Sequence, residues 1–291
     1  MTTTTTYTPA GVRAGLYAGK HNTALCDIGS FSEWIRALPA SKRSVDSEWC
    51  GGMDYTTARD AIWRGDMAGV AASDALLDQF ESVVPVSRSW RTVAAVAGGA
   101  PNVAAHLAGS PLSMRVRRRA LSQGAPLNVF VDIVSSYGVP AESLTRRGVA
   151  ALALVRALGA NRPVRVFGVA AMQHSEATSS QFIAVEIPAP VDLARAAFLL
   201  AHPAAARALA YEAGPRLAGF EANGSLGWAF RNHAKYLSKA RTIWAHVCGV
   251  AAEDCLYLAP PHASDSAITN PVTWIKDKLM ALGAAAGEEA A

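Results

Sequence analysis

Four stretches of apolar residues in the carboxy-terminal half of the chain predict β-strands. The most informative is "LNVFVDIV" (Leu127–Val134), an apolar run interrupted only by Asp132. A run of this kind is typical of a strand that is buried on both faces of a sheet. The other three are "PVRVFGVAA" (163–171), "QFIAVEIPA" (181–189) and "CLYLAPP" (255–261). The polar loop 172–180 is short enough to join the second and third as an antiparallel hairpin.

Helical patterns alternate with these strands. "RGVAALALVRAL" (147–158) is apolar nearly all round, as a helix covering a sheet would be, with Pro140 before it and Gly159 after it. A long helix is predicted over 190–214, kinked at Pro203, and a last one over 270–283. This order predicts an α/β fold with an open, mostly parallel sheet, in which a right-handed crossover makes the first two strands parallel.

The amino-terminal part has a different pattern. Short helices are predicted at 31–38, 56–65 and 73–82, the last with Ser73 as its N-cap, and glycines and prolines break the segment 93–114. We therefore divide the chain into a flexible arm (1–22), a mainly helical region (23–126), an α/β sheet domain (127–283) and a tail (284–291).

Basic residues form the first candidate site. "RVRRR" starts at Arg115, and in a predicted helix over 228–247 basic residues recur every four positions on one face. Such residues neutralise phosphates, and Tyr236 beside them could stack on a base. The alternative is a solvated surface that pairs with the chain's 23 acids. The candidate nucleic-acid-binding residues are Arg115, Arg117, Arg118, Arg119, Arg146, Arg147, Arg231, Lys235 and Lys239.

Asp132 and Ser136 form the second candidate site. They lie at the carboxyl end of the first strand, where open α/β sheets keep their functional crevice. The order of elements resembles the von Willebrand factor A domain, whose first strand ends in an Asp-x-Ser-x-Ser metal loop. Asp132 and Ser136 match this motif, but Val134 stands at its first serine and cannot ligate a cation. We therefore expect no cofactor, with a divalent cation at Asp132 and Ser136 as the alternative and simple turn chemistry as the ordinary explanation.

Three segments carry a second resemblance. "AGGAPNVAAHLAGSPLSM", "IVSSYGVPAESLTRRGVAALALVRAL" and "FLLAHPAAARALAYEA" are similar to segments of a family of uncharacterised bacteriophage proteins. The resemblance implies a phage or prophage origin and a location in the cytoplasm of the bacterial host.

Enzyme motifs are incomplete. "GLYAGKHNT" lacks the spacing of a phosphate loop, "HSE" has no Pro-Cys-x-x-Cys partner, and "GSPLSM" is not a nucleophile elbow. A hydrolytic group of Asp132, His262 and Asp265 is the one enzymatic alternative that we keep. The four cysteines form no zinc pattern, so free thiols are expected.

Composition limits the classes further. The 291 residues are 51% hydrophobic, with no signal peptide and no membrane span expected, and the net charge of +4 permits anionic partners without requiring them. We expect a non-enzymatic binding or assembly protein with a protein partner. The alternatives are a nucleic-acid-binding accessory factor in phage replication or gene expression, and a structural component of the virion.

Overall fold

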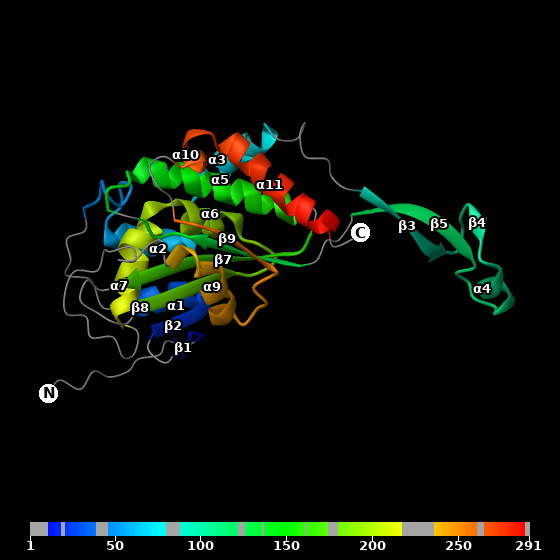
Figure 1. The fold of residues 1–291 in the computed structure, drawn as a ribbon, viewed down its shortest axis with the longest axis horizontal. Coiled ribbons are helices and arrows are strands. Elements are labelled where there is room, and N and C mark those ends of the chain that lie inside the picture. Colours follow the sequence, from blue (N-terminus) through cyan, green and yellow to red (C-terminus); the bar gives the residue numbers. More distant parts are fainter. Residues whose placement is uncertain are drawn as a thin grey trace.

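The protein is an α/β fold built on a six-stranded mixed sheet (Figure 1). The structure is a computed structural model, and it describes residues 11–18, 21–38, 46–79, 88–121, 126–135, 137–160, 162–173, 180–216, 236–260 and 265–288. The strands are β1 (Arg13–Tyr17), β2 (His21–Asp27), β3 (Arg88–Ala95), β4 (Ala100–Pro101), β5 (Met114–Leu121), β6 (Leu127–Asp132), β7 (Val164–Gln173), β8 (Ser180–Ile187) and β9 (Cys255–Leu258). The helices are α1 (Ile28–Ala37), α2 (Tyr55–Arg64), α3 (Met67–Asp78), α4 (Val103–Leu107), α5 (Ala141–Gly159), α6 (Leu193–Ala201), η1 (Ala205–Ala210), α7 (Tyr211–Ala213), η2 (Gly214–Arg216), α9 (Ala240–Cys248), α10 (Ser266–Thr269) and α11 (Pro271–Glu288).

The main sheet has the order β1-β2-β8-β7-β6-β9. The pairs β2–β8, β7–β6 and β6–β9 are parallel, whereas β1–β2 and β8–β7 are antiparallel. The predicted parallel pairing of the first two strands of the sheet domain and the predicted hairpin after them are confirmed. The sheet is mixed, because two of its five pairings are antiparallel.

Two strands of this sheet come from segments in which the sequence predicted none. β1 falls within the predicted flexible arm, 1–22, and β2 spans the predicted boundary between this arm and the mainly helical region. β2 adds in parallel to β8, so the amino-terminal segment completes the sheet. The exposed face of β1 explains why its hydrophobic signal is weak, since most of its residues face solvent at the sheet edge.

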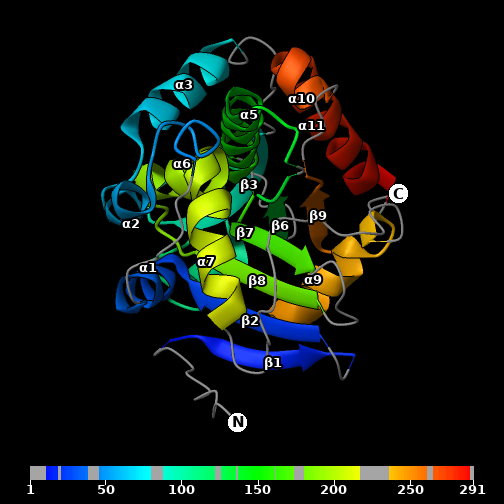
Figure 2. The same cartoon turned by 90° about the vertical axis from the view of Figure 1, so that its left-hand side faces the viewer.

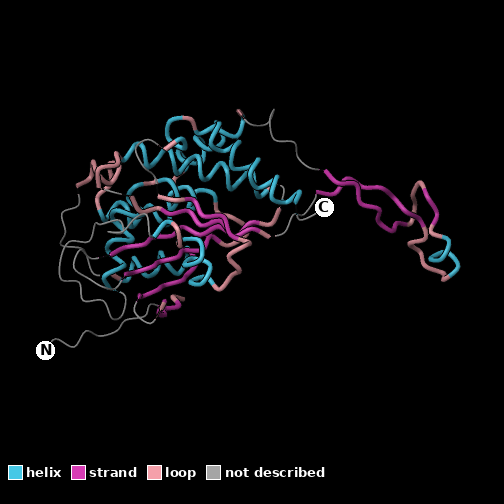
Figure 3. Tube along the Cα trace, viewed as in Figure 1, coloured by secondary structure: helices cyan, strands magenta, loops and turns pink. Residues whose placement is uncertain are grey.

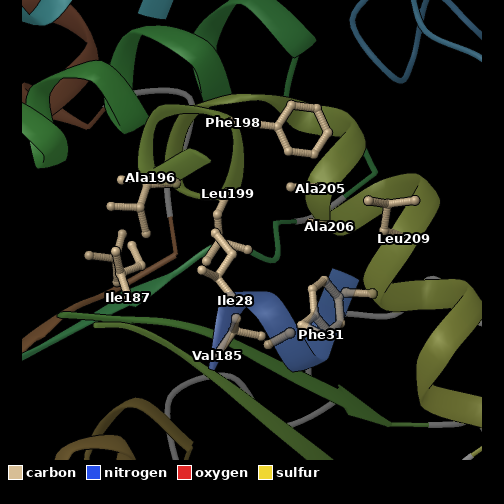
Figure 4. Close-up of a cluster of buried hydrophobic side chains, with 14 of the residues drawn as sticks. Ile28, Phe31, Val185, Ile187, Ala196, Phe198, Leu199, Ala205, Ala206 and Leu209 are labelled. Atoms are coloured by element: carbon tan, nitrogen blue, oxygen red, sulfur yellow. The ribbon is translucent and has the colours of Figure 1, made fainter. Parts of the chain in front are cut away.

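Helices cover both faces of the main sheet (Figure 2). On one face α1, α5 and α6 share a core with alternate strand residues such as Val129 and Val131, and α2 and α3 pack on these helices. On the other face α9 packs against Phe130 and its neighbours in the sheet. Figure 4 shows the first layer, in which Ile28 and Phe31 of α1 meet Val185 of β8 beneath α6. The alternation of inward directions along each strand produces the two cores.

Several helix boundaries differ from their predicted positions because side chains cap the helices elsewhere. α3 begins at Met67, where Asp66 accepts a hydrogen bond from the Gly69 amide, so the predicted N-cap Ser73 lies inside the helix. The long helix predicted over 190–214 starts after Asp192 and divides at His202 into α6 and η1. α11 continues through Gly283, the residue predicted to end it.

A second, three-stranded sheet of order β3-β5-β4 lies beyond the end of the main sheet (Figures 1 and 3). We call residues 88–121 the ribbon. β3 and β5 pair antiparallel over eight residues each, and α4 lies at the far end. This region was predicted to be mainly helical, and the structure corrects that prediction. Its arginines and small residues hid the strand pattern, because the ribbon lacks the alternation of polar and core positions that marks a strand packed on a protein body.

Helices α5 and α6 cross at a position that only glycine fits. A Cβ atom on Gly148 would lie 2.2 Å from the Cα of Ala201 and 2.3 Å from the carbonyl oxygen of Leu200. These contacts are with backbone, so the two helices would have to separate. On the same helix, a Cβ on Gly159 would meet nothing within 4 Å.

We predict that Gly148→Ala destabilises the protein by about 1–3 kcal/mol, the usual cost of overpacking a core. Gly159→Ala is the matched control, and it should be neutral or slightly stabilising because alanine favours helix. Chemical denaturation of both variants measures the difference. Equal stability of the two variants would contradict the close crossing of α5 and α6.

Candidate functional site

The carboxyl end of β6 holds a buried carboxylate at the centre of a hydrogen-bond network. Asp132 is 1% exposed. Its Oδ2 accepts hydrogen bonds from the hydroxyls of Tyr257 (2.8 Å) and Tyr236 (2.9 Å), and its Oδ1 accepts one from the Val134 amide (3.1 Å). The indole of Trp244 in turn donates to the Tyr236 hydroxyl at 2.9 Å. The network therefore joins β6, β9 and α9.

Burial and these donors act on the carboxylate in opposite directions. Burial raises the pKa of Asp132 to about 6, while the hydrogen bonds from Tyr257, Tyr236 and Val134 and the charge of Arg147 each lower it. Burial also lowers the pKa of Arg147, and Asp132 counteracts that effect. The buried aspartate and arginine thus stabilise each other's charged forms.

Two buried arginines fill the crevice around this network. Arg147 of α5 donates to the carbonyl oxygens of Leu258 (2.9 Å) and Ala259 (2.6 Å), just after β9. Arg207 of η1 donates to the carbonyl oxygens of Trp49 (2.7 Å) and Val139 (2.6 Å). A buried guanidinium must satisfy its donors, so each one fixes the loops that supply these carbonyls.

The space that the described residues leave beside Asp132 is small. The cavity that Asp132 lines with Leu144, Arg147 and His202 has a volume of about 10 Å³. Such a volume holds about one water molecule. Val134, the residue at the position of a required serine, is buried at 2% exposure. Within the described ranges, no group of three or more His, Cys, Asp or Glu side chains could hold a metal ion, and Ser136 lies outside those ranges.

Asp265, one residue of the hypothetical hydrolytic group, has a structural role. The Asp265 side chain accepts a hydrogen bond from the Ala267 amide at 2.9 Å and caps α10. His262 lies outside the described residues. His202, which also lines the cavity beside Asp132, stacks on Phe198 at a ring-centroid distance of 5.3 Å, and burial lowers its pKa. The four cysteines are free, as predicted.

The structure distributes the predicted nucleic-acid-binding residues over several places. Arg147 is 2% exposed and held by carbonyls, so it is not available to an external ligand. Arg146 is exposed on α5, where it pairs with Glu142 at 2.6 Å. Lys239 precedes α9, on the opposite face of the sheet from α5. Tyr236, expected to stack on a base, is instead a buried donor to Asp132. Arg231 and Lys235 lie outside the described residues.

The remaining four predicted arginines all lie on β5 of the ribbon. Residues opposite each other in an antiparallel pair share one face, and so do residues two apart along a strand. β3 and β5 pair with Trp90 opposite Arg119, Thr92 opposite Arg117 and Ala94 opposite Arg115. By this register one face of the ribbon carries Arg88, Trp90, Thr92, Arg115, Arg117 and Arg119. We call it the arginine face.

The opposite face of the ribbon is less basic. Arg91 and Arg118 stand opposite each other there, among Val93, Val116 and Met114. The register therefore separates four arginines and a tryptophan on one face from two arginines on the other. Sequence reasoning missed Arg88, Trp90 and Arg91 because they come more than twenty residues before "RVRRR" and join it only through strand pairing.

The far end of the ribbon exposes apolar side chains. Val96 is 72% exposed, Val103 62%, Leu107 81% and Leu112 45%. Val103 and Leu107 are four residues apart on α4 and so lie on one face of that helix. Among the ribbon side chains that the structure describes, none belongs to a buried core.

Comparison with known proteins identifies one matching family. The model of one family, "Domain of unknown function (DUF7192)", matches residues 4–279. No curated protein and no solved structure matches the chain. The described helices include none that is both long and apolar enough to cross a membrane.

The Asp132 network generates a pH-dependent prediction. Between pH about 4 and about 6 the unfolded chain has lost this proton while the native state keeps it, so the free energy of unfolding falls as the pH rises through that window. Tyr257→Phe removes a donor that favours the ionised form. We therefore expect a higher native pKa and a decline in stability that continues to higher pH than in the wild type.

Denaturant unfolding between pH 4 and pH 8 measures this profile. Tyr55→Phe is the matched control, since the buried Tyr55 hydroxyl has no hydrogen-bond partner within the described part of the chain. This control should keep the wild-type pH dependence. A Tyr257→Phe profile parallel to that of the wild type would contradict the assigned network.

Proposed function

We propose that this protein, which belongs to the DUF7192 family, is a non-enzymatic binding protein that grips nucleic acid with the arginine face of its ribbon. The single observation that carries the proposal is the register of β3 and β5. It gathers Arg88, Arg115, Arg117 and Arg119 with Trp90 on one side of a sheet that lies apart from the rest of the chain.

The dimensions of the ribbon favour a duplex. Eight residues of an antiparallel strand extend for about 27 Å, and a two-stranded ribbon fits the major groove of B-form DNA. Arginines on the face turned to the groove would neutralise phosphates or donate in pairs to guanine edges. Arginine suits this task because its guanidinium stays charged and presents paired donors.

The crevice at the carboxyl end of the main sheet gives weaker support to a non-enzymatic role than the arginine face of the ribbon does. Its carboxylate and two arginines are occupied by tyrosine hydroxyls and main-chain carbonyls, and the cavity beside Asp132 measures about 10 Å³. These groups hold the fold together. The ribbon is therefore the better candidate for the binding function.

Two further elements of the proposal rest on the sequence. We propose that the protein acts in the cytoplasm of a bacterium infected by a phage, as the resemblance to bacteriophage proteins implies. We also propose that β6 to β9 form a von Willebrand A-like core whose metal loop has been lost. Three features support the von Willebrand A-like core: β6 lies between β7 and β9, β8 is antiparallel to β7, and Asp132 ends β6.

A second candidate function is assembly with another protein chain, in the infected cell or in the virion. The exposed Val96, Val103 and Leu107 at the far end of the ribbon favour it. Apolar side chains exposed together often mark protein contacts. Both functions can coexist, since the arginine face and the far end are different parts of the ribbon.

The nucleic-acid proposal predicts a difference between the two faces. Arg117→Gln/Arg119→Gln should weaken binding to duplex DNA about 10-fold to 100-fold and reduce the salt slope of the binding constant by about 2, since each phosphate contact contributes about 0.9. Arg91→Gln/Arg118→Gln removes the same charge from the same ribbon but from its other face. It should change the affinity less than about threefold.

Fluorescence anisotropy at several salt concentrations, with single- and double-stranded DNA and RNA, measures both variants. Equal weakening by the two pairs would mean that only bulk charge matters and would contradict a binding face. No binding of any nucleic acid at micromolar protein would remove the proposal. A preference for single-stranded nucleic acid would be compatible with binding by the arginine face. It would contradict insertion of the ribbon into the major groove.

The assembly candidate predicts that self-association or partner capture depends on the far end of the ribbon. Val103→Ser/Leu107→Ser should reduce any concentration-dependent association seen by sedimentation velocity, because it removes exposed apolar area. Met280→Ser is the control, as Met280 is an equally exposed apolar residue (65%) on α11. An unchanged sedimentation profile in the double variant, where the wild type associates, would exclude the far end as the contact.

A further inference from the structure

A second positively charged site lies on the body of the protein, between α1 and α2. A cavity of about 400 Å³ is lined by Arg36, Thr56, Arg59, Asp60, Trp63 and Arg64. Three arginines against one aspartate leave two positive charges at this cavity. Volumes of this order hold small molecules, but typical small-molecule sites are mostly apolar. The charged lining indicates an anionic ligand.

The arginines are held in place by the helices that carry them. Arg59 of α2 donates to the carbonyl oxygen of Arg36, in the last turn of α1, at 2.5 Å. The Arg36 guanidinium lies over the ring of Trp63, 5.2 Å from its centroid. These contacts restrict the two side chains, so less conformational entropy is lost when a ligand binds.

Arg195 also contacts Trp63 and restricts its position. The guanidinium of Arg195 also lies 5.2 Å from the Trp63 ring centroid. Arg195 donates to the carbonyl oxygens of Ile62 (3.1 Å) and Ile28 (2.9 Å) and to the hydroxyl of Ser32 (2.7 Å). Through Arg195, Trp63 is therefore linked to both α1 and α2.

Most donors at the cavity remain open to a ligand. Within the described part of the chain, one hydrogen bond engages Arg59 and none engages Arg36, although each guanidinium has five N–H donors. Arg64 pairs with Asp60 at 3.7 Å, and both side chains are strongly exposed (80% and 67%). An exposed pair of this kind is weak, so an anion can displace Asp60 from Arg64.

We propose that this cavity binds a phosphate group, and that the ligand is a small phosphate monoester of nucleotide size. Guanidinium groups match the geometry of phosphate oxygens with paired donors, and the Thr56 hydroxyl at the rim adds a donor. Asp60 opposes binding and sets the affinity. The site is separate from the ribbon and does not depend on the function proposed for it.

Isothermal titration of the full chain with inorganic phosphate, adenosine monophosphate and adenosine tests the proposal. Phosphate and the monophosphate should bind, and adenosine, which lacks the phosphate group, should not. Arg36→Gln and Arg59→Gln should each weaken binding of the monophosphate about tenfold, whereas Asp60→Asn should strengthen it several-fold. Arg36→Gln keeps the test valid if the loss of the Arg59 contact to α1 impairs folding.

The matched control is Arg146→Gln. Arg146 also pairs with an acid one helical turn away, Glu142, and is exposed, but it lies on α5 away from the cavity. This control should leave the affinity unchanged, and equal weakening by it would overturn the site. Absence of heat with both phosphate and the monophosphate would also overturn the proposed ligand.

Duplex DNA binding by Arg36→Gln identifies the source of the phosphate. If Arg36→Gln lowers the affinity for duplex DNA about tenfold, well beyond the effect of Arg91→Gln/Arg118→Gln, the phosphate group belongs to a nucleic-acid backbone that reaches this cavity, and the monoester is overturned. If Arg36→Gln affects the monophosphate and leaves DNA binding intact, the ligand is a free small molecule. Loss of DNA binding in the ribbon variants with monophosphate binding intact shows that the two sites act independently.

Discussion

The burial of one carboxylate organises the centre of this protein. Asp132 ends β6 inside the fold, where an ionised acid without partners would be strongly unfavourable. Its partners come from distant parts of the chain, since Tyr236 is 104 residues and Tyr257 is 125 residues away in sequence. The hydrogen bonds from Tyr257 and Tyr236 to Asp132 therefore fix β9 beside β6 and hold the start of α9 against the sheet.

The same requirement accounts for the closed crevice. In an open α/β sheet the carboxyl ends of the strands leave a gap in which ligands usually bind. Here Arg147 and Arg207 extend into that region and donate to carbonyls of the loops around it. A guanidinium with several donors can tie two loops at once, and the described residues beside Asp132 enclose a cavity of about 10 Å³. The contacts of the described side chains at this location hold strands, helices and loops together.

The sequence predicted the buried elements well and the exposed ones poorly. The runs that became β6, β7, β8 and β9 and the helix α5 are apolar on nearly every face, so their burial could be recognised without knowledge of their neighbours. β1, β3 and β5 carry polar and basic residues, and their strand character depends on pairing with a partner strand. The arginines of β5 were recognised as a basic cluster, but their division between two faces required the register with β3.

Asp132 illustrates the other limit of sequence reasoning. Its place at the end of a buried strand was predictable, and the valine at position 134 argued against a metal loop. The tyrosines that occupy its oxygens could not be found, because no local pattern links Tyr236 or Tyr257 to a residue more than 100 positions earlier. The sequence also suggested a different role for Tyr236, since basic neighbours made it resemble a stacking residue.

The distribution of charge separates the interior from the binding surfaces. The interior arginines, Arg147 and Arg207, donate hydrogen bonds to main-chain carbonyls. Burial lowers the pKa of both side chains. Of the arginines at the cavity beside Trp63, Arg59 gives one donor to the carbonyl oxygen of Arg36, and Arg64 pairs with the exposed Asp60. An arginine that stabilises a fold is surrounded by fixed acceptors, whereas one that binds an anion must keep its donors open. By this criterion the cavity between α1 and α2 suits an anionic ligand better than the crevice at Asp132 does.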